Sequence, residues 1–216
     1  MFRNVSVIGA GRAGSAIAAR LRERGVSLRE DAELRILCVP DRAIAEAAGS
    51  IEPGPWVAHV SGATPLDALD PHVRRFSVHP LQTLVRTRGP EQLDGAWAGV
   101  TAESLEGHAR AVWLARTLGL RPFELADDRR AVYHAGAAIA SNFLVTLYRV
   151  ASHLVAEAGA PPEALVPLMT RTIENGFALT GPIVRGDWET VERHRAVLRG
   201  TPFETLYETL AEATRT

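Results

Sequence analysis

The sequence predicts an α/β protein, with a Rossmann-like parallel sheet over residues 1–126 and an all-helical C-terminal domain over residues 127–216. Three observations lead to this prediction. The chain opens with a short β-branched strand, a glycine-rich turn and a helix. Short apolar strands then alternate with helical segments, a pattern typical of a parallel sheet with crossover helices. Beyond Ala126 the apolar residues recur only at helical spacing.

The glycine-rich turn lies between a strand at residues 5–8 and a helix that continues through Leu21. Strand, G-x-G-x-x-G and helix in this order form the dinucleotide-binding fingerprint. Gly9 permits the tight turn, Gly11 lets a pyrophosphate approach the backbone, and Gly14 lets the helix pack closely on the strand. The first N–H groups of the helix lack intrahelical partners and attract an anion. We therefore expect NADP or NAD at Gly9, Ala10, Gly11, Arg12, Ala13 and Gly14, with a turn that binds nothing as the alternative.

The stretch after this helix departs from a complete dinucleotide site. Gly25 is suited to cap the helix, and residues 26–30 stand where a second strand should end in an acidic ribose ligand. Only residues 31–33 separate this stretch from a buried strand at 34–39, whereas a crossover between parallel strands takes about a dozen residues. We therefore expect the second strand and its helix to be shortened or missing, with residues 26–30 forming a loop, an edge hairpin or a remnant.

The other elements follow from apolar periodicity and turn residues. We expect further strands at residues 56–60, 76–78, 97–101 and 121–126, helices at 42–48 and 105–118, and a helical turn at 65–69. From Asp128 the pattern predicts one helix of about 30 residues, much longer than is usual. Further helices are expected from Pro161 toward Gly176, from Asp187 to Val197, and over residues 202–213.

Composition narrows the class of function. The formal net charge is −1 and aromatic residues make up 6% of the chain, which argues against nucleic acid or an anionic membrane as a partner. All 24 basic residues are arginine, which excludes lysine chemistry such as a Schiff base. The single cysteine, Cys38, excludes an internal disulfide. With no signal peptide and no apolar run of about 18 residues, we expect a cytoplasmic protein that acts on a small molecule.

Polar residues follow several predicted strands, where open parallel sheets bind their ligands. We expect one rim, with the cofactor contacted by Val39, Pro40, Asp41, Ser61 and Gly62, and the substrate by His59 and His79. The alternatives are that Asp41 is a helix cap and that His59 is a satisfied core residue. No two of His59, His79, His134 and His194 have the i, i+4 spacing of a helical zinc site, so we expect no metal.

The helical region adds further candidates. His134 and Ser141 are seven residues apart and would share a helix face, while Asn142 has poor helix propensity and needs a reason to be there. An interhelical hydrogen bond is the alternative to substrate contact for Asn142. Arg185 lies between the turn residues Gly181 and Gly186 and could clamp a carboxylate or phosphate, or be solvated in its loop.

Together these residues resemble a family that pairs an N-terminal Rossmann-like domain with a small helical C-terminal domain, related to ketopantoate reductase, pyrroline-5-carboxylate reductase and the 6-phosphogluconate dehydrogenase superfamily. The resemblance implies an NAD(P)-dependent oxidoreductase and a homodimer formed through the helical domain. Related β-hydroxyacid dehydrogenases carry a lysine where this chain has Ala138, four residues before Asn142. The matching strings are residues 7–14, 39–41, 59–63, 77–83, 133–137, 140–143 and 181–187.

The expected function is therefore an NAD(P)-dependent oxidoreductase that acts on a small carbonyl, hydroxy-acid or imine substrate in the interdomain cleft. Its expected catalytic residues are His134, Asn142 and His79, with either histidine moving the proton because its pKa suits neutral pH. Substrate contacts are expected from His59, His79, Ser141 and Arg185. The alternative is a non-catalytic binding or regulatory protein with a degenerate dinucleotide site, which the missing strand and lysine favour; a metal-dependent hydrolase is more distant.

Overall fold

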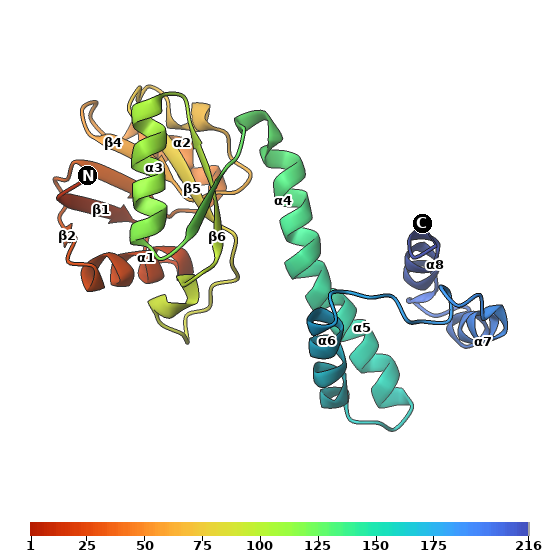
Figure 1. The fold of residues 1–216 in the computed structure, drawn as a ribbon. Helices are drawn as coiled ribbons and strands as arrows, with labels where there is room; N and C mark the ends of the chain where they lie inside the picture. The colour runs from red at the N-terminus through yellow and green to blue at the C-terminus, as the bar shows by residue number, and fades with distance from the viewer. Residues whose placement is uncertain (216) are drawn as a thin grey trace. The chain divides into compact units, whose positions relative to one another are not determined.

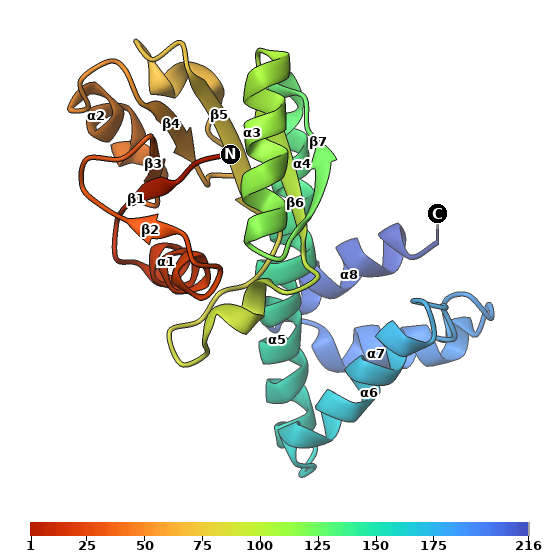
Figure 2. The same ribbon diagram turned by 60° about the vertical axis from the view of Figure 1, so that its left-hand side comes forward.

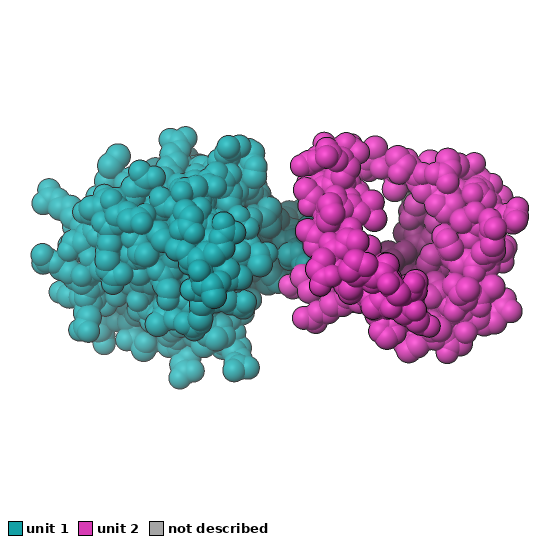
Figure 3. All heavy atoms as spheres, turned by 90° about the horizontal axis from the view of Figure 1, so that it is seen from below, with its two compact units in different colours: residues 1–141 teal, residues 142–216 magenta. Residues whose placement is uncertain are grey.

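The computed structural model of the chain describes residues 1–215 and divides into two compact units, residues 1–141 and 142–216 (Figures 1 and 3). The first unit is built on a seven-stranded sheet and the second is helical. This confirms the predicted fold class. The predicted change from strands to helices after Ala126 lies fifteen residues before the division between the units, because the helix that begins the C-terminal region packs on the sheet through Tyr133 and Arg130.

The sheet has the order β2-β1-β3-β4-β5-β6-β7. The pairs formed among the first five strands are all parallel, so β1, β3, β4 and β5 end at one common edge, the carboxyl rim. The strands are β1 (Asn4–Ile8), β2 (Ser27–Leu28), β3 (Leu34–Leu37), β4 (Trp56–His59), β5 (Arg75–Pro80), β6 (Trp97–Ala102) and β7 (Arg121–Glu124).

The expectation of an entirely parallel sheet was wrong at β6, which runs antiparallel to β5. A parallel connection must carry the chain back along the whole strand, usually through a helix. Between Pro80 and Trp97 the chain instead stays at the carboxyl rim, where the Leu81 N–H donates to the Trp97 carbonyl at 2.8 Å. Strand β6 therefore starts at the rim, and β7 follows it in the same direction.

The unusual second strand is a remnant, as one of the predicted alternatives had it. Strand β2 has two residues and pairs in parallel with Asn4 and Val5 at the start of β1. Strand β3 begins opposite the same residue, Val5. The chain therefore only has to cross sideways past β1, about 10 Å for two strand spacings, rather than return along a full strand. This is why five residues suffice without a helix.

Two apolar cores lie on opposite faces of the sheet, because neighbouring residues of a strand point to opposite sides. One core packs α1 (Arg12–Glu23) and α3 (Leu105–Thr117) against residues such as Ile36 and Ala58. The other packs α2 (Ile44–Gly49) against Leu37 and Val57. Figure 2 shows α3 lying along the strands. The predicted Gly25 cap is present, with φ of +72° and the Val26 N–H donating to the Leu21 carbonyl.

The long helix predicted from Asp128 is present and spans Asp127–Glu157. It comprises a 3-10 turn, α4 (Arg130–Ala138), a π turn (Ile139–Phe143) and α5 (Leu144–Glu157). The π turn was not foreseen, and α-helical spacing cannot be carried across it to place Ser141 and Asn142 relative to His134. The remaining helices are α6 (Leu165–Glu174), α7 (Trp188–Leu198) and α8 (Glu204–Ala213).

Among the described residues, the helix Asp127–Glu157 is the one that is long and apolar enough to cross a membrane by length and composition. Apolar helices of soluble proteins pass the same test, so this property alone does not identify a membrane span. Its first turns are tied to the sheet, since Arg130 is 2% exposed and binds strand residues.

Candidate functional site

The fingerprint turn contains two glycines that the fold itself requires. Gly9 has φ of +111°, and a Cβ there would lie 2.4 Å from the Cys38 carbonyl oxygen. A Cβ on Gly14 would lie 1.9 Å from the carbonyl oxygen of Gly9. Gly11 differs, because its φ is −71° and a Cβ would meet nothing within 4 Å. The packing of the chain therefore requires Gly9 and Gly14 but not Gly11, whose role within the fold is to be the N-cap of α1.

The first turn of α1 has the features of an anion site. Gly11 is its N-cap, no side chain caps it, and no acidic residue lies in its first turn. Arg12 and Ala10 are exposed. Arg86, from the loop after β5, reaches back so that its Nη1 lies 3.5 Å from the Ala10 carbonyl oxygen. Free N–H groups, the helix dipole and two arginines thus provide positive potential at this turn.

The end of β2 does not bring an acidic residue to this turn by its register. β2 ends opposite Val5, three residues before β1 ends at Ile8. Glu30 is exposed beyond that end. Glu33 lies before β3 and accepts a hydrogen bond from the Arg3 N–H at 3.1 Å, at the opposite edge of the sheet from the glycine-rich turn. The ribose contact of a complete dinucleotide site is therefore not reproduced by Glu33.

A second group of polar residues lies where α4 crosses the carboxyl rim. The Nδ1 atom of His79, in β5, is 2.7 Å from the hydroxyl of Tyr133 on α4. The rings of His79 and His134 lie 6.2 Å apart. Gly62, after β4, fits closely against both, because a Cβ there would lie 2.7 Å from His79 Cε1 and 2.9 Å from His134 Cδ2. Three separate segments thus meet at Gly62.

Arg130 anchors this part of α4 to the sheet. Its side chain is 2% exposed. Its Nε donates to Asp127 Oδ1 at 2.6 Å, and its Nη1 donates to the Ser61 carbonyl at 3.1 Å. Nη2 donates to the Ser77 hydroxyl. Because Arg130 binds both β5 and the segment after β4, it holds α4 in the position that brings Tyr133 and His134 to the rim.

His59 lies beneath the rim and is fully buried. Its Nδ1 accepts a hydrogen bond from the Ser61 N–H at 3.2 Å, which braces the loop that carries Ser61 and Gly62. Burial, with a smaller contribution from the nearby charge of Arg130, lowers the pKa of His59 to about 3. In this conformation the ring is a neutral support for the loop and has no face open to solvent.

The structure thus brings several predicted site residues to one rim. Ser61, Gly62, His79 and His134 lie together. The negative charge of Asp41 is near enough to raise the pKa of His79. Pro40 and Asp41 are exposed after β3. Ser141 instead donates its hydroxyl to the Ala137 carbonyl of its own helix at 2.7 Å. Asn142 and Arg185 belong to the second unit, where Arg185 binds the Thr180 carbonyl.

Sequence reasoning missed Arg130 and Ser77 as members of this group, and it singled out Tyr133 beside His134 without giving it a role. A signal for Arg130 was present, because Asp127 and Arg130 have the i, i+3 spacing of a helical ion pair. Tyr133 is adjacent to a candidate and lies one helical turn from Arg130. Ser77 has no signal of its own beyond being a hydroxyl within an apolar strand.

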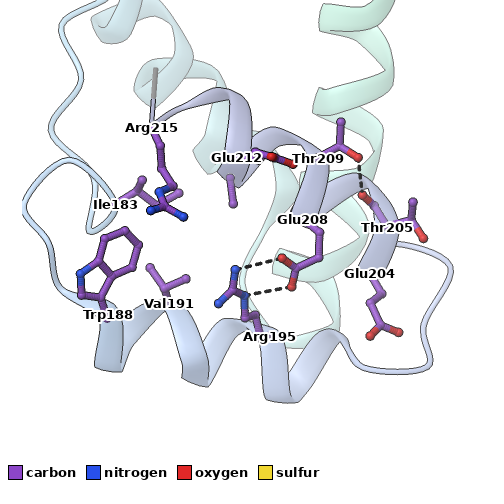
Figure 4. A pocket seen from close by; sticks show the side chains of 11 residues that line it. Ile183, Trp188, Val191, Arg195, Glu204, Thr205, Glu208, Thr209, Glu212 and Arg215 are labelled. Atoms are coloured by element: carbon purple, nitrogen blue, oxygen red, sulfur yellow. Dashed lines mark hydrogen bonds and ion pairs between the residues drawn. The ribbon is translucent and has the colours of Figure 1, made fainter.

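The second unit carries a groove of about 440 Å³ between α7 and α8 (Figure 4). Arg195 crosses it and forms a two-pronged ion pair with Glu208 at 2.9 and 3.0 Å. Arg215 lies over the Trp188 ring, 5.2 Å from its centroid. These charged groups are already paired within the unit, so they account for the packing of α7 on α8.

The fold and these sites define a class of protein with a Rossmann-like sheet, a glycine-rich turn after its first strand and a helical C-terminal region. The chain belongs to the family described as "Domain of unknown function (DUF2520)", which matches residues 96–214, more than half of its 216 residues. None of the curated proteins matches the chain.

Solved structures match over nearly the whole chain. A protein from Bacteroides fragilis, provisionally described as an NADP oxidoreductase, is 24% identical with a TM-score of 0.82, covering 99% of this chain and 98% of that one. A protein from Thermotoga maritima is 22% identical with a TM-score of 0.79, covering 98% and 96%. 1-Pyrroline-5-carboxylate reductase from Streptococcus pyogenes is 12% identical with a TM-score of 0.63, covering 98% of both chains. These likenesses show the fold.

Proposed function

We propose that the protein is an NAD(P)-dependent oxidoreductase that acts on a small carbonyl, hydroxy-acid or imine substrate. The observation that supports it most is Gly11, which neither backbone conformation nor packing requires to be glycine. A pyrophosphate resting on the backbone is the ordinary reason for a glycine at this position. The description of the Bacteroides fragilis relative as an NADP oxidoreductase agrees with this.

In this proposal the first turn of α1 and Arg12 hold the pyrophosphate, and the loops that carry Pro40 and Gly62 border the nicotinamide. The bound cofactor supplies a hydride. The protein supplies a proton, for which the exposed imidazole of His134 is better suited than buried groups. Asn142, Ser141 and Arg185 remain candidates for substrate contact.

The test is a titration of the protein with NADPH and NADH, followed by energy transfer from its tryptophans. We expect a Kd below about 1 mM, which corresponds to a free energy near −4 kcal/mol. Gly11→Ala should weaken binding at least about tenfold, or 1.4 kcal/mol. Its Cβ meets no atom, so we expect a loss of stability of no more than about 1 kcal/mol, which arises because alanine is a poorer N-cap than glycine. Gly49→Ala is the matched control, since its Cβ also meets nothing within 4 Å. Absence of binding in the parent protein would refute the proposal.

One observation favours a second candidate, a binding or regulatory protein with a degenerate site. β2 ends opposite Val5, so its pairing does not extend to the glycine-rich turn, and the turn could serve a phosphate-sized ligand alone. Inorganic phosphate that competes with a fluorescent phosphate probe, together with no NADPH binding up to millimolar concentration, would identify this function.

We also propose that the helical unit forms a homodimer. Within residues 142–215 the buried apolar side chains are Val191, Leu198 and Ala211. Figure 3 shows the atoms of this unit surrounding an open space. Leu168, Phe177 and Leu179 are each more than 60% exposed. So little buried apolar surface cannot offset the entropy of ordering these helices, so the exposed apolar side chains need a partner surface. In a preparation of the protein alone, that partner is a second copy of the chain.

Light scattering after gel filtration should give the mass of a dimer. Leu168→Glu combined with Ile173→Glu should shift the protein to monomer, because both side chains are exposed on α6. Val73→Glu, at a position 91% exposed in the other unit, is the control and should leave the dimer intact. A monomeric parent protein, or sedimentation with phosphatidylcholine vesicles, would instead indicate another role for this apolar surface.

A further inference from the structure

The contact between His79 and Tyr133 couples the tautomer of His79 to the orientation of the Tyr133 hydroxyl. The Tyr133 hydroxyl lies 2.7 Å from Nδ1. Burial raises the pKa of Tyr133 to about 12, so the hydroxyl keeps its hydrogen at neutral pH. Among the described residues this hydroxyl has Nδ1 as its partner. A hydroxyl that keeps its hydrogen can donate it to Nδ1, and in that arrangement a neutral His79 carries its own proton on Nε2.

His79 is neutral at physiological pH. Burial, together with the nearby groups His134 and Arg130 on α4, lowers its pKa to about 4, against a smaller opposing effect of Asp41 after β3. Tyr133 faces the ring as well, but its hydroxyl is uncharged. The imidazole is therefore a poor proton donor at pH 7, yet its N–H remains a hydrogen-bond donor.

The Nε2 atom of His79 is available at the rim. It has no hydrogen-bond partner within residues 1–215, and it is not among the buried side-chain atoms that lack one. It lies beside Gly62, whose Cβ would come within 2.9 Å of it. A residue with a side chain at position 62 would displace the imidazole, so the glycine preserves the position of this donor.

We propose that Tyr133 is a positioning residue that holds neutral His79 with its Nε2–H at the rim, and that this donor selects a carbonyl oxygen over a protonated imine. The inference deepens the proposed function and rests on it. A carbonyl oxygen accepts a hydrogen bond from the N–H. This hydrogen bond strengthens as the oxygen gains negative charge during reduction. A protonated imine offers no acceptor for this N–H. His79 then keeps its proton, and proton transfer is left to His134.

The tautomer is tested in the protein without cofactor, by nitrogen-15 NMR of the histidine side chains. In the parent protein His79 should show a protonated Nε2 and an unprotonated Nδ1 from pH 6 to 8. Tyr133→Phe should produce a mixture of the two tautomers. Tyr207→Phe is the matched control, because its hydroxyl lies 2.9 Å from Nδ1 of His194 in the other unit. It should alter His194 and leave His79 unchanged.

Substrate selection is tested with two small probes, acetate as an oxygen acceptor and methylammonium as a mimic of a protonated imine. Acetate should shift the His79 Nε2–H signal saturably, methylammonium should not, and Tyr133→Phe should weaken the acetate response at least threefold. A His79 protonated on Nδ1, an unaltered tautomer in Tyr133→Phe, or no response to acetate would overturn the inference. A parent protein that does not bind NADPH would refute the proposed function separately, because none of these NMR signals requires cofactor.

Discussion

Replacing Arg130 with methionine tests whether this residue secures α4 to the sheet. The change removes three hydrogen bonds, to Asp127, to the Ser61 carbonyl and to Ser77, while keeping an apolar stem of similar length. Breaking a buried ion pair typically costs about 3–5 kcal/mol. The remaining carboxylate of Asp127 is 37% exposed and still accepts from the Leu66 N–H, so we expect the lower end, about 3 kcal/mol.

Urea denaturation followed by circular dichroism and tryptophan fluorescence measures this loss. With a slope of about 2 kcal/mol per molar urea, the midpoint should fall by about 1.5 M. Arg193→Met is the control, because the 3.9 Å pair of Arg193 with Glu189 is 69% and 85% exposed, and such pairs contribute less than about 1 kcal/mol. Arg130→Met with no larger effect than Arg193→Met would refute the anchoring role. Combining Arg130→Met with Asp127→Asn should give a coupling energy of about 1–2 kcal/mol.

Two further predictions concern the glycine-rich turn and acid stability. Gly14→Ala should destabilise the protein by about 1–3 kcal/mol because its Cβ would lie 1.9 Å from the Gly9 carbonyl oxygen; a urea midpoint like that of Gly11→Ala would contradict this. The pKa values of His59 and His79 are about 3 and about 4, against about 6.5 in an unfolded chain. The unfolded state therefore binds more protons between these values, and stability should fall as pH drops from about 6.5 toward 4, by up to about 1.4 kcal/mol per pH unit for each histidine. His59→Gln should flatten the dependence of the urea midpoint on pH, and an unchanged slope would argue against a buried neutral His59.

The sequence was sufficient for features that depend on local pattern. The glycine-rich turn, the strands around it and the helix Asp127–Glu157 follow from periodicities of two and 3.6 residues and from glycine positions. The shortened second strand followed from chain length alone, because the three residues 31–33 cannot make a full crossover. The rim was also predictable, since parallel strands end at a common edge.

Features that depend on tertiary pairing were beyond the sequence. The direction of β6 is decided by where the loop from Pro80 to Trp97 closes, and its apolar pattern is the same in either direction. In the sequence, Arg130 is one arginine among 24 basic residues. Its burial is possible because hydroxyl and carbonyl groups on distant segments accept its hydrogen bonds. The π turn has no signature in the pattern, because inserting one residue leaves the helix apolar on both sides.

The two-residue length of β2 has a consequence for solubility. The backbone groups of Val7 point to the same side as those of Val5, where β2 has already ended. Unpaired edges of this kind are sites at which strands of other molecules add and aggregation begins. Here the open stretch is about one residue pair long, and the exposed charged residues Arg29, Glu30 and Asp31 follow directly beside it. The short β2 thus ends the sheet without leaving an edge long enough to nucleate intermolecular pairing.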